Sequence, residues 1–500
     1  MDNRVSQSQM PQDKGQRGRV KNMYGYEALS GLSIVEKNQR RSAMADGQDS
    51  NGASAGLNPA TEGVSPVDKG NHFSMKFPAP FMRRMFLPIG QGAFYCERFY
   101  LAWSYKPITM VYDCGAVHLA GKVWSKALQT NFSALMARHF PEGLKTIHAL
   151  FISHFDSDHI NGLELLRQHG VEIKQFFLPG IEKDDRWLMD LWFESMDPEG
   201  IARDVFQNPD ILVSMFPGAS VNIVQPSFPP QDSDVSETPE TVKLVELNAE
   251  FMTTPFKDWV FSPFNYRRAD YIDKLLDELS KELNLPKTLS NKELREHWER
   301  NGALSIDMMK GVFSRVLPKH GSGTKFNTNS MTVFSGPQNH HEGELQQSLV
   351  DCGQDSCLWA SSLQALAPGG LFTGDYNATD FMQALTAFYG TRWNDIGCVQ
   401  IPHHGSIRGF HKGFLGLDAI FVASAAFNHR YGHPSQSVEG HFQPPKHLFC
   451  VTEKADSCLC SLVREPNSSG IIPTCGMGLH TLNHLANVLG SKKKSSFAQG

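Results

Sequence analysis

The sequence contains no run of about 18 apolar residues, which argues against a membrane-spanning helix. Its first residues, MDNRVSQSQMPQDKGQRGR, have no apolar core behind their charges, so they are not expected to act as a secretory signal. A disulfide framework is not indicated, because the nine cysteines are odd in number and lack regular spacing. No sequence repeat is present. These absences predict a soluble, cytoplasmic, globular protein.

Positive charge is not in excess either. The chain has 47 Lys and Arg against 52 Asp and Glu, a formal net charge of −5. Binding to nucleic acid through bulk charge is therefore not expected. One stretch, residues 308–341, holds four Lys or Arg and no Asp or Glu. It would either line a groove for a polyanion or form an ordinary solvated face.

The chain has 500 residues, of which 40% are hydrophobic and 10% aromatic, and this suits one large domain with insertions. Residues 1–74 carry mixed charges and few large apolar side chains after Val35, which predicts a disordered tail. A folded domain is expected over 75–490, with an insertion at about 180–328. Residues 491–500 are expected to form a basic tail, and one hypothesis is that translation starts at Met75.

Strands and helices alternate along the expected domain. Aromatic and β-branched runs bounded by Gly or Pro predict strands near 82–89, 93–103 and 108–115, and a helix follows over 122–139. Later, an apolar run at 371–373 precedes a helix at 378–389, and another run covers 396–402. This order predicts an α/β fold. Within the insertion, a charged helical pair at 266–300 predicts a mainly helical subregion.

The strongest local signal is the segment SHFDSDH. Four side chains that can bind metal lie within six residues after a buried strand: His154, Asp156, Asp158 and His159. Imidazole suits Zn²⁺ and similar ions, whereas carboxylates favour harder ions. The alternative is a polar turn whose carboxylates cap the next helix.

Three more segments place the same residue types at the ends of apolar strands. Asp375 follows 371–373, His403 and His404 follow 396–402, and His433 comes after a further strand ending near 424. Each signal alone is weak, since a lone histidine is usually structural. Open α/β sheets collect their sites at the carboxyl ends of strands, so the four segments together predict one metal site.

These motifs resemble the metallo-β-lactamase superfamily. HFDSDH is similar to its HxHxDH motif, GDY to its later Asp motif, and VYDCG, which contains Asp113, to its early Asp. The likeness is closer to the branch fused to DNA-uptake channels of the ComEC/Rec2 type, with GQG, SHxDxDH, Asn329-Ser330, TGD, PHHGS and YGHP in the same order. The whole arrangement also resembles the metallo-hydrolase component of bacterial antiviral defence systems of the AVAST type.

The resemblance implies a metallo-β-lactamase-like αβ/βα sandwich, with two divalent metal ions, Zn²⁺ or Mn²⁺, at one edge of the sheets. In that family pattern His154 and Asp156 would face one ion, and Asp158 and His159 the other. Asp375 would bridge both ions. Either His403 or His404 would complete the shell, and His433 would bind an ion or contact substrate.

Two departures from the family pattern matter. Asp156 stands where most of the superfamily has histidine, which shifts the preference toward a harder ion such as Mn²⁺. The family's middle histidine has no clear counterpart, and His320, His340 and His341 are the candidates for it.

The resemblance also implies roles in catalysis. Asp158 would orient the attacking nucleophile, His404 or His433 would protonate the leaving oxygen, and Asp113 would orient a metal ligand.

The sequence thus predicts a metal-dependent hydrolase of phosphodiester bonds, with nucleic acid as the leading substrate. A role in antiphage defence with operon protein partners is the expected setting. An open basic groove in the insertion would favour the nuclease, and a lid would favour a small ester, amide or signalling nucleotide as substrate. A metal-binding scaffold subunit of a defence complex is the third alternative.

Overall fold

The computed structural model describes most of one compact unit of the chain, Lys76–Gly500. The described residues are 79–101, 106–116, 126–140, 143–196, 200–227, 241–266, 269–287, 289–301, 306–316, 330–338, 344–350, 366–427, 432–443, 446, 448–454, 457–466 and 468. The expected tails at 1–74 and 491–500 lie outside them, and so do His320, His340 and His341. None of the helices that the structure describes is both long and apolar enough to cross a membrane.

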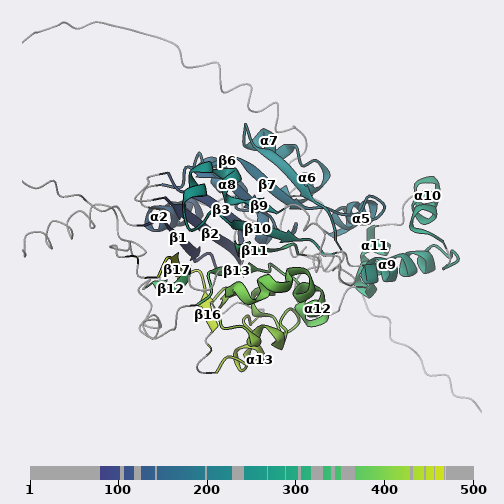
Figure 1. Cartoon of the computed structure of the whole chain (residues 1–500). Helices are drawn as coiled ribbons and strands as arrows, with labels where there is room; N and C mark the ends of the chain where they lie inside the picture. Colours follow the sequence, from purple (N-terminus) through teal and green to yellow (C-terminus); the bar gives the residue numbers. More distant parts are fainter. Residues whose placement is uncertain are drawn as a thin grey trace, which may run out of the picture. The chain divides into compact units, whose positions relative to one another are not determined.

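The first sheet has eight strands, six from the N-terminal half of the chain and two, β12 and β17, from later in the sequence. Most of its N-terminal strands are labelled in Figure 1. Strands β1, β2 and β3 pair antiparallel, whereas β3, β5, β7 and β8 run parallel. In spatial order the strands are β12 (Gln346–Val350), β17 (Leu459–Arg464), β1 (Phe81–Phe86), β2 (Gly92–Tyr100), β3 (Ile108–Ala116), β5 (Ala149–Phe151), β7 (Gln175–Pro179) and β8 (Ser220–Val224). A separate pair, β4 (Thr146–Ile147) and β6 (Glu172–Ile173), lies outside this sheet.

The second sheet has seven strands and carries most of the C-terminal half. Strands β13 to β16 are parallel, and β9, β10, β11 and β13 are antiparallel. The spatial order is β16 (Leu448–Val451), β15 (Ile420–Ser424), β14 (Ile396–Gln400), β13 (Gly369–Phe372), β11 (Thr332–Pro337), β10 (Trp259–Phe264) and β9 (Val242–Lys243).

The inner faces of the two sheets share one aromatic core. Tyr95 of the first sheet stacks on Phe372 of the second with ring centroids 3.7 Å apart, and Phe99 meets Trp259 edge-on at 5.5 Å. A fully buried ion pair, Arg84 with Glu97 at 2.8 Å, also lies between the sheets. The Arg84 guanidinium donates to the carbonyl oxygens of two residues that open β13. The sheets therefore pack face to face as a sandwich.

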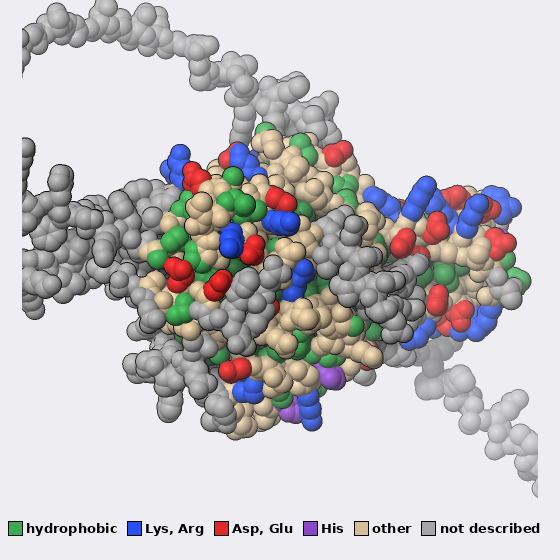
Figure 2. Space-filling model, in the orientation of Figure 1, with side chains coloured by type: hydrophobic (Ala, Val, Ile, Leu, Met, Phe, Trp, Pro, Cys, Tyr) green, Lys and Arg blue, Asp and Glu red, His purple; other side chains and the backbone are tan. Residues whose placement is uncertain are grey.

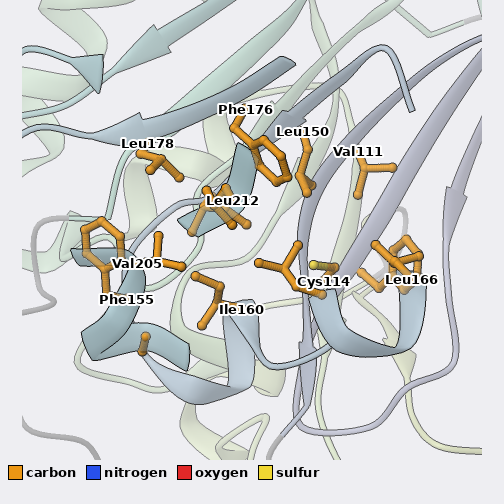
Figure 3. Close-up of a cluster of buried hydrophobic side chains, with 14 of the residues drawn as sticks. Val111, Cys114, Leu150, Phe155, Ile160, Leu166, Phe176, Leu178, Val205 and Leu212 are labelled. Atoms are coloured by element: carbon orange, nitrogen blue, oxygen red, sulfur yellow. The ribbon is translucent and has the colours of Figure 1, made fainter. Parts of the chain in front are cut away.

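Helices cover both outer faces, which gives four layers. On the first sheet, apolar side chains of the loop and helices such as Phe155, Ile160 and Leu212 pack onto Phe176 and Leu178 of β7 (Figure 3). The helices on this side include α2 (Lys126–His139), α3 (Ser157–Ile160), α4 (Leu163–Gln168), α5 (Arg186–Met196), α6 (Ile201–Gln207) and α7 (Ile211–Met215).

On the second sheet, α12 (Ala378–Tyr389) packs its buried face onto β13 and β14. Short helices complete this half and the region before β10: α8 (Leu244–Leu247), η2 (Ala249–Thr253), η5 (Gly390–Asp395), η6 (His403–Gly405), η7 (Lys412–Gly416) and α13 (Gln436–Glu439). The predicted α/β fold class is confirmed by these layers of helices and sheets.

The predicted insertion at about 180–328 differs from the structure in one respect. Strands β8, β9 and β10 fall within this range and belong to the two main sheets, so the region is not only helical. Its helices are α5 to α8 and η2, followed after β10 by α9 (Ala269–Glu282), α10 (Asn291–Asn301) and α11 (Ile306–Val316).

Charges on α9, α10 and α11 are of both signs and are interspersed (Figure 2). Arg315 lies 2.9 Å from Glu278, Arg295 lies 2.8 Å from Glu299, and Lys287 pairs with an aspartate of α9. Acidic neighbours offset these cations. Of the four cations in the basic stretch 308–341, Arg315 is paired in this way, and Lys319 and Lys325 lie outside the described residues.

Candidate metal centre

The candidate site residues lie where strands of both sheets end. His154 follows β5, and Asp158 and His159 lie in the short helix α3 that comes next. On the second sheet, Asp375 follows β13, and His403 begins η6 directly after β14. The strands β3 and β5 are parallel neighbours, and so are β13 and β14. The carboxyl ends of the two parallel pairs therefore deliver the side chains to one place.

The two carboxylate oxygens of Asp375 face different groups. Its Oδ2 lies 3.5 Å from Nε2 of His403 and 3.9 Å from Nε2 of His154. Its Oδ1 lies 3.4 Å from Nε2 of His159 and 3.6 Å from Nε2 of His404. The carboxylate thus has a pair of imidazoles on each side.

Two further carboxylates complete this division. Oδ2 of Asp156 lies 3.5 Å from Nε2 of His154, and Oδ2 of Asp158 lies 3.3 Å from Nε2 of His404. We call His154, Asp156 and His403 the first ligand set, and Asp158, His159 and His404 the second ligand set. The ligand atoms of the second set all lie within 4.8 Å of one another, as do those of His154, His159 and Asp375.

Hydrogen bonds at Nδ1 fix the tautomers of two histidines. Nδ1 of His159 lies 2.8 Å from Oδ2 of Asp113, and Nδ1 of His404 lies 2.8 Å from the carbonyl oxygen of Ser424. A carboxylate or carbonyl oxygen only accepts, so each Nδ1 carries the proton and donates it. In the neutral imidazole, Nε2 is then left with a lone pair that points toward Asp375.

The same reasoning applies to His154 through a serine. Oγ of Ser153 donates to Oδ2 of Asp113 at 2.8 Å, and so it can only accept from Nδ1 of His154, also 2.8 Å away. The Ser153 N–H donates to the other Asp113 oxygen at 2.7 Å. Asp113, which is fully buried, therefore orients both His159 and, through Ser153, His154.

The atoms that face one another in this site offer lone pairs. Nε2 of His154, His159 and His404 and Oδ1 of Asp375 are buried, and none makes a hydrogen bond of acceptable geometry with the described residues. Buried polar atoms normally have partners. Imidazole nitrogens and carboxylate oxygens are ligands of divalent transition metals, so this donor set fits a pair of such cations.

In the metal-free protein, protons on the imidazoles balance the negative charge of the carboxylates in this cluster. Burial favours neutral imidazole, but Asp113 and Asp158 raise the pKa of His159 well above its usual value. His404 behaves likewise, because Asp375 and Asp158 raise its pKa against the effect of burial. Burial opposes ionisation of Asp158 too, yet the two imidazoles lower its pKa to about 2. A cation that took these nitrogens as ligands would displace protons from the histidines.

The backbone is strained at three of the site residues. Asp113, His403 and His404 have φ angles of 55°, 50° and 56°, in the left-handed region. They are three of only four non-glycine residues with positive φ in the described part of the chain. Such conformations cost about 1–2 kcal/mol per residue and persist where the surrounding structure enforces them, which is common at functional sites.

Glycines allow the loops to approach closely. A Cβ on Gly115, at the end of β3, would lie 2.6 Å from the backbone carbon of Asp158. A Cβ on Gly92 would lie 2.7 Å from the Asp158 carbonyl oxygen. Gly405 is equally restricted, since its Cβ would lie 2.6 Å from Cβ of Pro434. The GQG, VYDCG and PHHGS glycines therefore hold the ligand-bearing loops together.

The structure brings together every site residue that the sequence predicts, with His433 at the margin. Its ring centroid lies 5.9 Å from that of His403, and it is partly exposed. Sequence reasoning expected one of His403 and His404 to complete the metal shell and offered His404 as a proton donor; in the structure both imidazoles face Asp375. It also missed the partners of the imidazoles: Ser153, Ser330 and the carbonyl oxygen of Ser424. The SH and NS motifs contain the two serines, but a motif does not show where a hydroxyl points.

No family model matches this chain, and no curated protein matches it. Among solved structures, the chain is similar to the long form of RNase Z from yeast, at 9% sequence identity and a TM-score of 0.24. The match covers 64% of this chain and 32% of the yeast chain. The activity proposed below therefore depends on the geometry of the site and not on this match.

Proposed function

We propose that the protein is a metallo-β-lactamase-like hydrolase that uses two divalent metal ions. The observation that carries this proposal is the position of Asp375. Each of its two oxygens faces its own pair of imidazole Nε2 atoms, within 3.4 to 3.9 Å. One carboxylate between two sets of lone-pair donors is the arrangement expected for a bridging ligand.

In this proposal the first ligand set holds one ion, the second ligand set holds the other, and Asp375 is shared. Asp156 gives the first set a harder donor than a third imidazole would, which suits Mn²⁺ as well as Zn²⁺. In this proposal His403 serves as the third ligand of the first set, where the family's middle histidine has no clear counterpart in the sequence. When bound, a pair of divalent cations lowers the pKa of water and stabilises negative charge on a phosphoryl oxygen.

We assign His404 as a ligand and not as the proton donor. Its Nδ1–H donates to the Ser424 carbonyl, and its Nε2 faces Asp158 and Asp375, so in its neutral form it has no proton to direct at a substrate. His433 lies beside His403 and is partly exposed, and its imidazole can donate a proton to a leaving oxygen. The oxygens of Asp158 can accept a proton from, and so orient, an attacking water.

The substrate class in this proposal is a phosphodiester, with nucleic acid as the leading example. The centre is partly exposed at two of its carboxylates, since the side chains of Asp156 and Asp158 are 18% and 20% exposed. These carboxylates mark the side from which a substrate would approach. Two-metal centres suit in-line displacement at phosphorus, because both the entering and the leaving oxygen are stabilised. A place in antiviral defence stays a prediction, which the identity of neighbouring genes would test.

The test uses the full chain, purified without metal and supplied with Mn²⁺ or Zn²⁺. Bis(p-nitrophenyl) phosphate, single-stranded DNA, double-stranded DNA and RNA are assayed beside a carboxylic ester and a β-lactam. We expect cleavage of phosphodiesters that disappears in Asp158→Ala and Asp375→Ala. Asp210→Ala, which removes an exposed carboxylate just before α7, is the matched control and should keep full activity.

Two outcomes would replace this function. Hydrolysis of only the ester or the β-lactam would move the substrate class to acyl compounds. If the wild type binds metal but hydrolyses none of these substrates, and Asp158→Ala and Asp375→Ala lose only the metal, a scaffold role is favoured.

A further inference from the structure

Ser330 joins the two halves of the candidate centre. It is fully buried and lies just before β11, in the second sheet. Its Oγ accepts a hydrogen bond from the Asp375 N–H at 2.8 Å and lies 3.0 Å from Nδ1 of His154. The next residue, Met331, donates its N–H to the carbonyl oxygen of Ser153 at 2.8 Å. The start of β11 thus contacts both ligand-bearing loops.

We propose that Ser330 is a positioning residue that sets the spacing between His154 and Asp375, and so controls binding of the ion held by the first ligand set. This inference rests on the proposed two-metal centre. His154 comes from the first sheet and Asp375 from the second, and their facing atoms are 3.9 Å apart. One hydroxyl contacts both residues, so it fixes this distance across the boundary between the sheets.

The direction of the hydrogen bonds supports this role. The Asp375 N–H can only donate, so Ser330 Oγ accepts from it. Nδ1 of His154 carries a proton, because Ser153 directs its own proton to Asp113 and can only accept. Ser330 Oγ is thus a second acceptor for the same Nδ1–H. The hydroxyl steadies the tautomer in which Nε2 of His154 has the lone pair.

The second ligand set does not depend on Ser330. Its histidines are held by Asp113 and by the Ser424 carbonyl, and neither contact involves the hydroxyl. The loop of Asp375 has other anchors as well: the His403 N–H donates to the Gly374 carbonyl at 2.8 Å, and the Tyr376 N–H donates to the Thr373 carbonyl at 3.0 Å. Removing the hydroxyl should therefore affect the two ions unequally.

The experiment compares Ser330→Ala with wild type and with Ser335→Ala. Ser335 is a matched control, because it is a fully buried serine of β11, five residues after Ser330, whose hydroxyl bonds Glu97 and Trp259 in the core and not the centre. Mn²⁺ alone is titrated into metal-free protein by calorimetry, and electron paramagnetic resonance counts coupled and isolated ions. Imidazole ¹⁵N shifts of His154 report its tautomer without metal.

In wild type we expect two ions and the Nδ1–H tautomer at His154. In Ser330→Ala the ion of the first ligand set should bind about 10- to 100-fold more weakly. The paramagnetic resonance signal of two coupled Mn²⁺ ions should then be replaced by that of an isolated ion. The affinity for the ion of the second ligand set should stay unchanged. The ¹⁵N shifts should show that His154 populates both the Nδ1–H and the Nε2–H tautomer. Ser335→Ala should lower the melting temperature and leave both affinities as in wild type.

Equal weakening of both ions, or weakening of neither, would overturn the role of Ser330. The hydrolase function fails separately, since a wild type that binds two ions and cleaves no substrate rejects the function and keeps the positioning role. A wild type that binds no ion rejects both.

Discussion

Replacement of Asp375 by asparagine is the sharpest test of the bridging geometry. The amide has nearly the same shape as the carboxylate but only one oxygen. Whichever way it turns, one ligand set faces an NH₂ group, which cannot bind a cation. Both sets also lose the negative charge between them. Asp375→Asn should thus affect both ions, and one of them more strongly than the other.

The size of the effect follows from the distances. The facing imidazole nitrogens lie 3.4 to 3.9 Å from the Asp375 oxygens, so a cation between them lies closer still. Two unit charges about 4 Å apart interact by about 4 kcal/mol at an effective dielectric constant of 20. This corresponds to a loss of about 1,000-fold in affinity.

Two corrections to the expected 1,000-fold loss of affinity act in opposite directions. A divalent cation carries two charges, which doubles its attraction to the Asp375 carboxylate. In the metal-free protein, however, His403 and His404 hold the pKa of Asp375 well below its usual value despite its burial, and those ion pairs are lost as well. We therefore keep about 1,000-fold as the expected loss for the more strongly affected ion.

Competition with a chelator of known affinity, followed by metal analysis, measures the change. Asp210→Asn serves as the control for charge, because it removes one carboxylate outside the centre. The melting temperature of metal-free Asp375→Asn shows whether the fold survives. Asp375 is not the bridge if the folded variant still binds two ions with affinities within about tenfold of wild type. A tenfold change corresponds to about 1.4 kcal/mol of binding free energy for each ion.

Three further predictions follow from the same geometry. His404→Ala should lose the ion of the second ligand set. His433→Ala should keep both ions and lower kcat only for substrates whose leaving oxygen needs a proton, so its kcat for a p-nitrophenyl ester should stay as in wild type. Loss of metal in His433→Ala would contradict the assignment of His433 as the proton donor. The pKa values of His159 and His404 are raised in the metal-free protein, so these imidazoles keep protons that a metal must displace. The affinity for metal should therefore fall as pH is lowered. Calorimetry in buffers of different ionisation enthalpy should show the release of protons on metal binding. A binding enthalpy independent of the buffer would count against this. Gly115→Ala places a Cβ 2.6 Å from the backbone of Asp158 and should destabilise the protein by about 1–3 kcal/mol, seen as a lower midpoint in urea; an unchanged midpoint would show that α3 can move away.

The α/β fold class and the convergence of the site could be predicted because both depend on local patterns. Apolar runs bounded by Gly and Pro mark the strands, and each candidate ligand lies in the loop or short helix that follows one of them. His154 and Asp375 were expected to converge because each follows an apolar strand, and their facing atoms lie 3.9 Å apart although β5 and β13 belong to different sheets.

Strand β10 shows where such patterns fail. Its sequence, WVFSPF, contains Pro263, and a proline argues against a strand that has partners on both sides. The strand nevertheless lies between β9 and β11, where Pro263 is in register with Val333. Pairing with β9 covers only Val260 and Phe261, so Pro263 has a paired strand on one side alone and its missing N–H is tolerated. How far β9 extends along β10 is a property of the packed sheet.

The amino-acid sequence by itself determined which donor types end which strands: two histidines and two aspartates after β5, one aspartate after β13, and paired histidines after β14. Only the tertiary structure decided that both His403 and His404 face Asp375, one on each oxygen, and that hydroxyls and a carbonyl hold the imidazoles. The reason is physical. Spacing along the chain sets the order of donors on one strand end, but His154 and Asp375 are more than two hundred positions apart, and the distance between them is set by how the two sheets pack.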